Sequence, residues 1–264
     1  MENSAETKAV CKISDIVWAA IAIGASIILA TIIGADSFYR SKQLSNVLSV
    51  TGSAERMVSS DTVKWQSVLS RSVDAYGLKQ GSAAMKNDLQ IIKKYFKDSG
   101  VEDGEVVVNP VTVSPVCESQ NGIFYDKYGG QTCGSSRTTG YNLQQVITVE
   151  STKVKEVGDL SQASSDYFIG QGLVFTTQSL EYYYSKLADL RLDLLSDATK
   201  DAKARAEKIA QSTGKEIDAL QSASMGVFQV TAKNSVDVSD YGIYDTNSLE
   251  KKVTGVVRVS FSLK

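Results

Sequence analysis

The chain has 264 residues with 28 basic and 30 acidic side chains, a formal net charge of −2 that gives no general attraction to nucleic acid or anionic lipid. It contains no histidine, which excludes Ser-His and Cys-His catalysis and removes the usual zinc ligand. After a hydrophobic N-terminal segment, about 210 to 220 residues remain for one large or two small folded domains.

The first predicted element is a hydrophobic helix over residues 16–35, with a tail at 1–15 before it and a linker at 36–46 after it. Its 20 residues carry no charge and as a helix span roughly 30 Å, the thickness of a bilayer core. We therefore predict an uncleaved transmembrane anchor. A cleaved signal peptide is the alternative. It is disfavoured because the apolar run is longer than usual, and because Ile33 would occupy the position before a cut at Ala35 where a small residue is needed.

The flanking charges do not orient this anchor, because two lysines precede it and Arg40 and Lys42 follow it. Cysteine usage does. Cys117 and Cys133 enclose a polar, glycine-rich segment, and a disulfide there would contribute on the order of 3 kcal/mol. Such a bond persists only in an oxidising compartment, so we predict a periplasmic domain at 47–264 on the inner membrane, with Cys11 on the cytoplasmic side. Two unpaired thiols are the alternative.

Alternating and helical patterns predict seven strands and three helices after the linker. The strands are 47–57, 62–73, 106–116, 137–151, 173–177, 217–231 and 252–263, and the helices are 77–99, 153–170 and 180–214. The order β-β-α-β-β-α-β-α-β-β predicts an α+β fold, a mainly antiparallel sheet with helices packed on one face, because 62–177 has the order of a split βαβ sandwich.

The helix predicted from Leu180 to Gly214 is the longest of the three. Its apolar positions recur at spacings of three and four, which places them on one face: Leu187, Leu190, Leu194, Ala198, Ala202, Ala206 and Ile209. Ser185 is a candidate cap at its start and Gly214 at its end. Because leucine gives way to alanine along this face, we expect the C-terminal half to approach its supporting sheet closely.

Three consecutive tyrosines, Tyr182, Tyr183 and Tyr184, stand at the predicted junction between a strand and the long helix. Three neighbouring phenols cannot all face one core. We predict that this junction lies in or beside an oligomer interface. The alternative is that two tyrosines are buried and one lies at the surface.

The order and spacing of several short motifs resemble the SIMPL-domain family of bacterial envelope proteins, formerly grouped as a domain of unknown function. These are Val50-Thr51-Gly52-Ser53-Ala54-Glu55, Asp61-Thr62, Gly140-Tyr141, Asp201-Ala202-Lys203-Ala204-Arg205-Ala206-Glu207 and Val257-Arg258-Val259-Ser260-Phe261. The segment 180–195 looks like the longer, membrane-anchored branch. The resemblance implies an extracytoplasmic α+β domain, with relatives that form ring-like or channel-like oligomers or are linked to oxidative-stress defence.

No residue pattern predicts catalysis, a cofactor or a metal. The glycine-rich run 129–134 lacks the Gly-Lys-Ser/Thr end of a phosphate loop, and Ser212 to Lys215 has the S-x-x-K spacing but coincides with a helix end. Asp237, Asp240 and Asp245 share a polar loop without the spacing of a calcium hand. We expect solvated carboxylates there.

These patterns predict a non-enzymatic, membrane-anchored scaffold or interaction module of the cell envelope. We expect a homo-oligomer, contact with the lipid bilayer through the N-terminal helix, no nucleic-acid partner, and a role in stress defence. The alternative function is an envelope hydrolase that uses the carboxylates Glu102, Asp103 and Glu105. A third interpretation is a pore or scaffold in which several anchors pack together, for which Ala20 and Gly24 have the small-x-x-x-small spacing.

Overall fold

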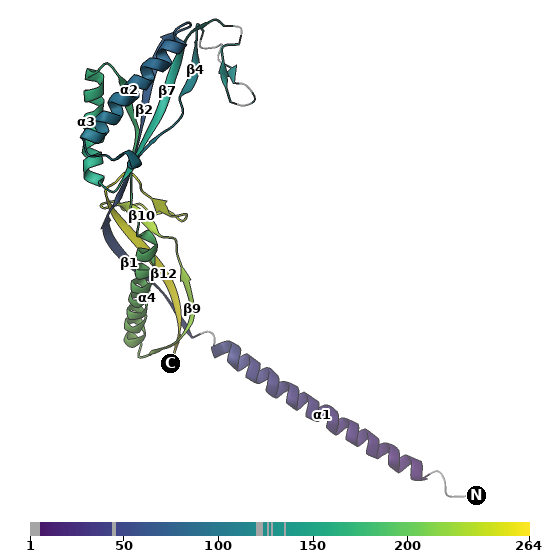
Figure 1. The fold of residues 1–264 in the computed structure, drawn as a ribbon. Helices are drawn as coiled ribbons and strands as arrows, with labels where there is room; N and C mark the ends of the chain where they lie inside the picture. The colour runs from purple at the N-terminus through teal and green to yellow at the C-terminus, as the bar shows by residue number, and fades with distance from the viewer. Residues whose placement is uncertain (1–5, 44–45, 120–123, 126, 128, 135) are drawn as a thin grey trace. The chain divides into compact units, whose positions relative to one another are not determined.

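A computed structural model describes residues 6–43, 46–119, 124–125, 127, 129–134 and 136–264 (Figure 1). The chain divides into two compact units, which are described separately. Unit 1 comprises Met1–Ser53, Ala198–Met225 and Val257–Lys264, and unit 2 comprises Ala54–Asp197 and Gly226–Val256.

The elements follow the α+β order that the sequence predicts. The helices are α1 (Glu6–Gln43), α2 (Leu78–Asp98), a short 3-10 helix η1 (Asp103–Glu105), α3 (Val154–Gly170) and α4 (Leu187–Ser212). The strands are β1 (Val47–Ser59), β2 (Thr62–Asp74), β3 (Val106–Val108), β4 (Thr112–Cys117), β5 (Phe124–Tyr125), β6 (Gln131–Thr132), β7 (Thr138–Ser151), β8 (Val174–Tyr183), β9 (Ile217–Met225), β10 (Gln229–Ala232), β11 (Ile243–Tyr244) and β12 (Glu250–Leu263).

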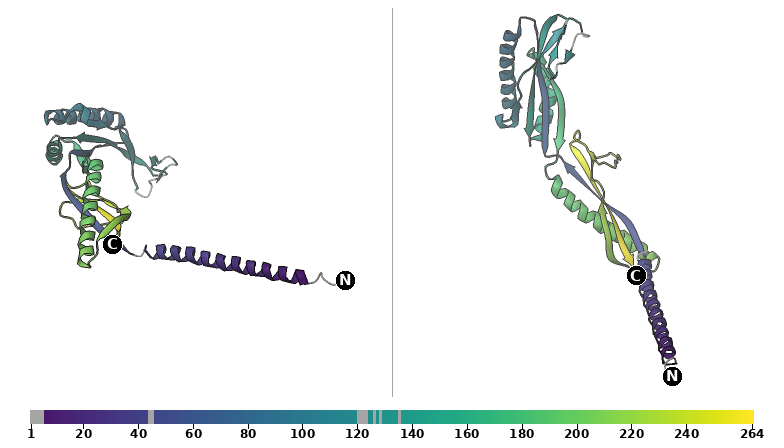
Figure 2. Two further views of the ribbon diagram at one scale, coloured as in Figure 1. Left: turned by 90° about the horizontal axis from the view of Figure 1, so that it is seen from below. Right: turned by 90° about the vertical axis from the view of Figure 1, so that its right-hand side faces the viewer.

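Unit 2 contains an antiparallel sheet of order β3-β7-β2-β8, with β4 also paired to β7. Its central strand β2 pairs with β7 from Val63↔Ser151 to Asp74↔Gly140. Both α2 and α3 cover one face of this sheet (Figure 1 and Figure 2). The core between the layers includes Trp65, Phe96, Phe168 and Phe175, whose rings pack at tilted and edge-on angles. The prediction of helices on one face of an antiparallel sheet is confirmed.

The other five-stranded sheet has the order β1-β12-β10-β11, with β9 also paired to β12. β12 alternates as its sequence predicts, with Val253, Val257, Val259 and Phe261 buried on one face. Within unit 2, Leu190 and Leu194 of α4 pack against Val230 and Val253. Within unit 1, the buried residues of α4 are all alanines: Ala198, Ala202, Ala206 and Ala210.

Gly52 of β1 explains why the C-terminal half of α4 is lined with alanine. A Cβ atom at this position would lie only 2.8 Å from the Cα atom of Ala202 and closer still to the backbone of Ala198. The strand and the helix therefore meet backbone against backbone in unit 1. The predicted close approach is confirmed.

The structure corrects the predicted start of the long helix. Residues 180–183 belong to β8, and α4 begins at Leu187. The reason is strand pairing, because Trp65 lies opposite Leu180 and Val63 opposite Tyr182 in the sheet. A run as short as residues 180–183 is locally compatible with a strand or a helix, and pairing with β2 makes it a strand.

Three smaller predictions also change. Ile209 is 45% exposed, and Ala210 takes the buried position, because the alanine stripe continues at intervals of four residues. The strand predicted at 106–116 separates into β3 and β4 on either side of Pro110, which has no N–H to donate. The strand predicted at 217–231 separates into β9 and β10 around Gly226.

The apolar part of α1 extends over Val17–Phe38, 22 residues, none of which is buried within the protein. Among the residues that the structure covers, it is the one helix long and apolar enough to cross a membrane. Its length and position suit a membrane anchor or a signal sequence.

We expect Gly52→Ala to lower the free energy of unfolding by about 1–3 kcal/mol, because the new methyl group forces the backbones of β1 and α4 apart. Chemical denaturation followed by circular dichroism measures this change. Gly170→Ala is the matched control, since a Cβ there meets no atom within 4 Å. Equal stability of the two variants would contradict the close approach.

Candidate functional site

Asp61, in the turn between β1 and β2, binds the connection between β8 and α4. Its carboxylate accepts the backbone N–H of Ser185 at 2.8 Å and the Ser185 hydroxyl at 2.7 Å. The Asp61 N–H in turn donates to the carbonyl of Tyr183 at 2.9 Å. We call Asp61, Tyr183 and Ser185 the Asp61 junction. It holds the chain at the point where β8 ends and α4 is about to begin.

The Asp61 carboxylate is stabilised in its ionised form. Partial burial alone would disfavour the charge, but the hydrogen bonds donated by Ser185 and Thr62 outweigh it and hold the pKa of Asp61 below its ordinary value. The junction therefore carries a negative charge at neutral pH. The sequence predicts part of this junction, because it identifies Ser185 as a candidate helix cap. It does not identify Asp61 as the partner of Ser185.

The structure distributes the three tyrosines among different surroundings. Tyr182 packs against the core of the β3-β7-β2-β8 sheet, and Tyr184 packs against the Leu190 and Leu194 cluster. Tyr183 donates its hydroxyl to Glu181 at 2.6 Å, and this bond, with burial, raises the pKa of Tyr183 to about 12. Each ring is half-buried. Their assignment to an oligomer interface stays a prediction.

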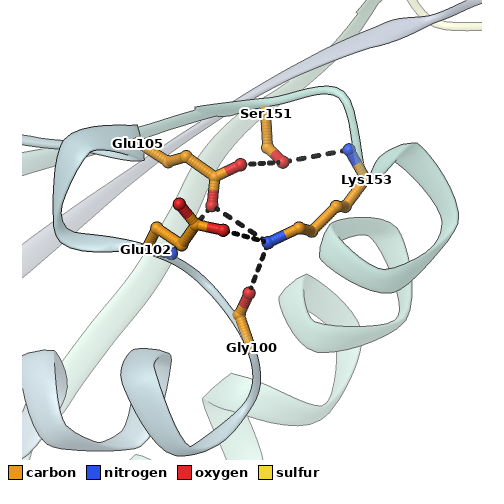
Figure 3. A network of polar contacts seen from close by, with 5 residues as sticks. All are labelled: Gly100, Glu102, Glu105, Ser151 and Lys153. Atoms are coloured by element: carbon orange, nitrogen blue, oxygen red, sulfur yellow. Dashed lines mark hydrogen bonds and ion pairs between the residues drawn. The ribbon is translucent and has the colours of Figure 1, made fainter.

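Two carboxylates of the alternative hydrolase site, Glu102 and Glu105, lie in a turn braced by Lys153 (Figure 3), and Asp103 lies between them in η1. Glu105 accepts the Ser151 hydroxyl at 2.6 Å and the Glu102 N–H at 2.8 Å. The Lys153 ammonium donates to the Gly100 carbonyl at 2.9 Å and to Glu102 at 3.1 Å, and lies 3.7 Å from Glu105. These contacts join the loop after α2 to the start of α3.

This network favours the charged forms of Glu105 and Lys153. Burial of Glu105 disfavours ionisation, but hydrogen bonds from Ser151 and Glu102 and the charge of Lys153 outweigh it and lower the pKa. The hydrogen bond to Glu102 raises the pKa of Lys153. A carboxyl held ionised in this way is a poor general acid at neutral pH, since that role needs a raised pKa. The turn has the properties of a structural brace.

The loop between β4 and β7 contains the disulfide between Cys117 and Cys133 that the sequence predicts. Cys133 is buried, whereas the strands β5 and β6 of the same loop are exposed. The disulfide links the end of β4 to the exposed loop that contains β5 and β6.

The aspartates of the polar loop do not gather around one point. Asp245 accepts the N–H groups of Asn247 at 3.0 Å and Ser248 at 3.2 Å, which closes a turn. In the described part of the chain, no group of three His, Cys, Asp or Glu side chains is placed to hold a metal ion.

The fold and these contacts define a class of protein: an α+β chain with an N-terminal apolar helix, in which clustered polar side chains brace turns between strands and helices. The family model that matches is SIMPL, described as a protein of unknown function (DUF541), and the match covers residues 48–261. The chain belongs to the SIMPL family. No curated protein matches it.

We expect Asp61→Asn to lower the free energy of unfolding at pH 7 by about 1–2 kcal/mol, because Ser185 loses hydrogen bonds to a charged acceptor. The folded-state pKa of Asp61 lies below its unfolded value, so this contribution is present above the unfolded pKa and is lost as pH falls through the folded one. Urea unfolding between pH 7 and pH 2 measures the convergence of variant and wild type. Asp98→Asn, in an exposed pair with Lys94, is the control. A pH-independent difference would contradict this account.

We expect alkylation of the denatured, unreduced protein to modify one cysteine, Cys11, and alkylation after reduction to modify three. Intact-mass measurement of protein purified without reductant distinguishes these species. Modification of three cysteines before reduction would show that Cys117 and Cys133 are not paired in the cell.

Proposed function

We propose that this SIMPL protein is a non-catalytic scaffold or interaction module of the bacterial cell envelope that works as a homo-oligomer. In this proposal α1 holds the chain in the inner membrane, and the folded part stands on the periplasmic side. The apolar, unburied face of α1 supports the membrane anchor. The disulfide supports a location of the folded part on the oxidising side of the membrane.

The observation that carries the assembly is the exposed edge of β9. This strand has nine residues, it pairs on one side with β12, and every residue after Ile217 is exposed. From Ala219 to Met225 it contains no charged residue and no proline. Natural proteins usually protect long edge strands with charges, prolines or bulges, because unpaired N–H and C=O groups attract another strand. The pairing of β9 with β12 has two irregularities, between the partners of Ser260 and Phe261 and between those of Phe261 and Leu263, but from Ala219 to Met225 the strand has no charge or proline to block a second strand, which favours pairing with another chain.

The side chains of β9 are compatible with antiparallel pairing to a second copy of itself. If the two copies are centred on Gln221, Ala219 lies opposite Ala223 of the partner and Ile217 lies opposite Met225. Asp218 then faces Ser224, so no like charges meet. The small residues along the strand also allow close contact. We therefore propose β9 as an isologous interface.

The remaining parts of the proposal rest on composition and family. A net charge of −2 supports a role without nucleic acid. The alternative hydrolase is disfavoured because Glu102 and Glu105 are engaged by Lys153 and Ser151. Resemblance to relatives linked to oxidative-stress defence supports a role in the stress response of the envelope.

The register can be tested by introducing charged residues at Ala219 and Ala223 in full-length protein extracted in a neutral detergent. Ala219→Lys with Ala223→Lys places lysine opposite lysine in both cross-strand pairs, and we expect it to lower the oligomer mass, since like charges repel. Ala219→Lys with Ala223→Glu places lysine opposite glutamate, and we expect it to retain the mass of the wild type. Light scattering measures the mass, and circular dichroism verifies the fold.

An oligomer that tolerates both β9 variants equally would contradict this interface. The tyrosine junction would then be the next candidate, and replacing Tyr182 and Tyr183 with serine tests it in the same assay. A monomeric wild type would contradict assembly itself.

A further inference from the structure

The outer side of α2 carries a row of lysines. Helix α2 lies on the outside of the sheet of unit 2, so one side of it meets solvent (Figure 2). Lys79, Lys86, Lys93 and Lys97 are exposed and follow one another at spacings of seven, seven and four residues, which places them on this side. We call these four residues the lysine row. It extends over about 27 Å of helix, at 1.5 Å per residue.

The positive charge of the lysine row is not neutralised within the described part of the chain, where none of the four lysines makes an ion pair. The two carboxylates of α2 have other partners. Asp88 is buried and binds Arg71 at 2.6 Å, and Asp98 binds Lys94 at 2.6 Å. A chain with a formal net charge of −2 therefore contains a surface on which positive charge is concentrated.

The lysine row does not stabilise the helix that carries it. Lys93 and Lys97 are four residues apart, a spacing at which like charges on a helix repel. Lys79 lies in the first turn, which has no acidic residue, although the helix dipole favours negative charge there. Anions bound along the row would relieve both of these unfavourable interactions.

A pocket of about 400 Å³ lies beside the C-terminal part of the row. Its lining residues are Gln90, Lys93, Lys94, Lys97, Asp103 and Val106. Even with Lys94 paired to Asp98, two ammonium groups remain for the one carboxylate of the lining. The Gln90 amide adds an N–H donor. A phosphate group suits this pocket, because it is anionic and accepts several charge-assisted hydrogen bonds.

The length of the row indicates what kind of phosphate compound it fits. One phosphate fills one pocket, whereas a row of about 27 Å needs several phosphates at once. A membrane of anionic phospholipid presents phosphates over its whole surface, and each lysine near such a surface adds to the attraction. Attachment of α1 to a bilayer would raise the effective concentration of headgroups around the chain, so that weak individual contacts suffice.

We propose that the lysine row of α2 docks on the headgroups of an anionic phospholipid membrane, with one phosphate in the pocket that Lys93 and Lys97 line. This inference rests on the membrane anchor of the proposed function, and it does not involve β9.

The test places a fluorophore in the lysine row and a quencher on the lipid. Full-length protein with Cys11→Ser and Ala83→Cys is labelled at position 83, which is exposed between Lys79 and Lys86. It is reconstituted in nanodiscs whose lipids carry nitroxide headgroups. We expect quenching to be several-fold stronger when half of the lipid is phosphatidylglycerol than in phosphatidylcholine alone, and to weaken with added salt. Asn234→Cys, at an exposed loop position outside α2, is the matched control and should respond equally to both lipids.

Two variants of the labelled protein test the charges themselves. The first combines Lys79→Gln, Lys86→Gln, Lys93→Gln and Lys97→Gln, and we expect it to lose the additional quenching in phosphatidylglycerol. The second places arginine at the same four positions, keeps the charge and should be quenched like the parent protein. Circular dichroism verifies the fold of both. Undiminished quenching of the glutamine variant would overturn the proposal.

Size-exclusion chromatography of the nanodiscs separates failure of the anchor from failure of the lysine row. Protein that is retained in neither lipid overturns the membrane anchor and this proposal with it. Retained protein that phosphatidylglycerol quenches no more than phosphatidylcholine overturns this proposal alone. Inorganic polyphosphate is the soluble alternative, and its binding to the row without any quenching by phosphatidylglycerol would also overturn the membrane contact.

Discussion

The hydrogen bonds of the Asp61 carboxylate are the interaction on which the layout of unit 2 depends. They bring the turn between β1 and β2 onto Ser185, 124 positions later in the chain. Two backbone bonds reinforce the same place, from Ser60 N–H to the Leu249 carbonyl at 2.9 Å and from Tyr182 N–H to the Thr246 carbonyl at 2.7 Å. Since a charged acceptor strengthens a hydrogen bond, this one carboxylate fixes the turn between β1 and β2 against the segment that leads from β8 into α4.

Lys251 serves the same purpose next to this place with the opposite charge. Its side chain is 1% exposed, and its ammonium donates to the carbonyls of Asp245 at 2.6 Å and Ser248 at 2.7 Å. Burial lowers the pKa of Lys251, and the nearby Asp245 carboxylate partly restores it. A buried ammonium is tolerated because several oxygens surround it. The turn 245–248, which leads into β12, is therefore fixed from inside the protein.

The sequence predicts the elements whose apolar residues lie on one face. It fails where pairing with a segment distant in the chain determines whether residues form a helix or a strand. β12 alternates as far as Phe261 and β2 as far as Leu69, so their strand assignment and buried faces can be predicted from the sequence. The residues from Leu180 to Tyr183 suit a helix or a strand, and only β2, more than 100 residues earlier, makes them a strand. The disulfide was predictable because both cysteines flank one local loop. The buried side-chain oxygens of Gln229 and Thr231, which have no hydrogen-bond partner among the described residues, were not predictable, because these residues acquire their neighbours through the register with β12.

The distribution of satisfied and unsatisfied polar groups separates the braced parts of the chain from the parts open to a partner. Glu105, Asp61 and Lys251 each have donors or acceptors within the protein, and each holds a turn. The outer edge of β9 and the oxygens of Gln229 and Thr231 differ, because their complement does not come from the described residues. The two buried oxygens cost stability because no partner replaces the water that they lose on folding, whereas the N–H and C=O groups of the β9 edge are exposed and bond to water. The β9 edge is thus the place where a partner can be added without disturbing bonds that the fold already makes, which is why the proposed function rests on it and not on the acidic turn, whose carboxylates are already bonded.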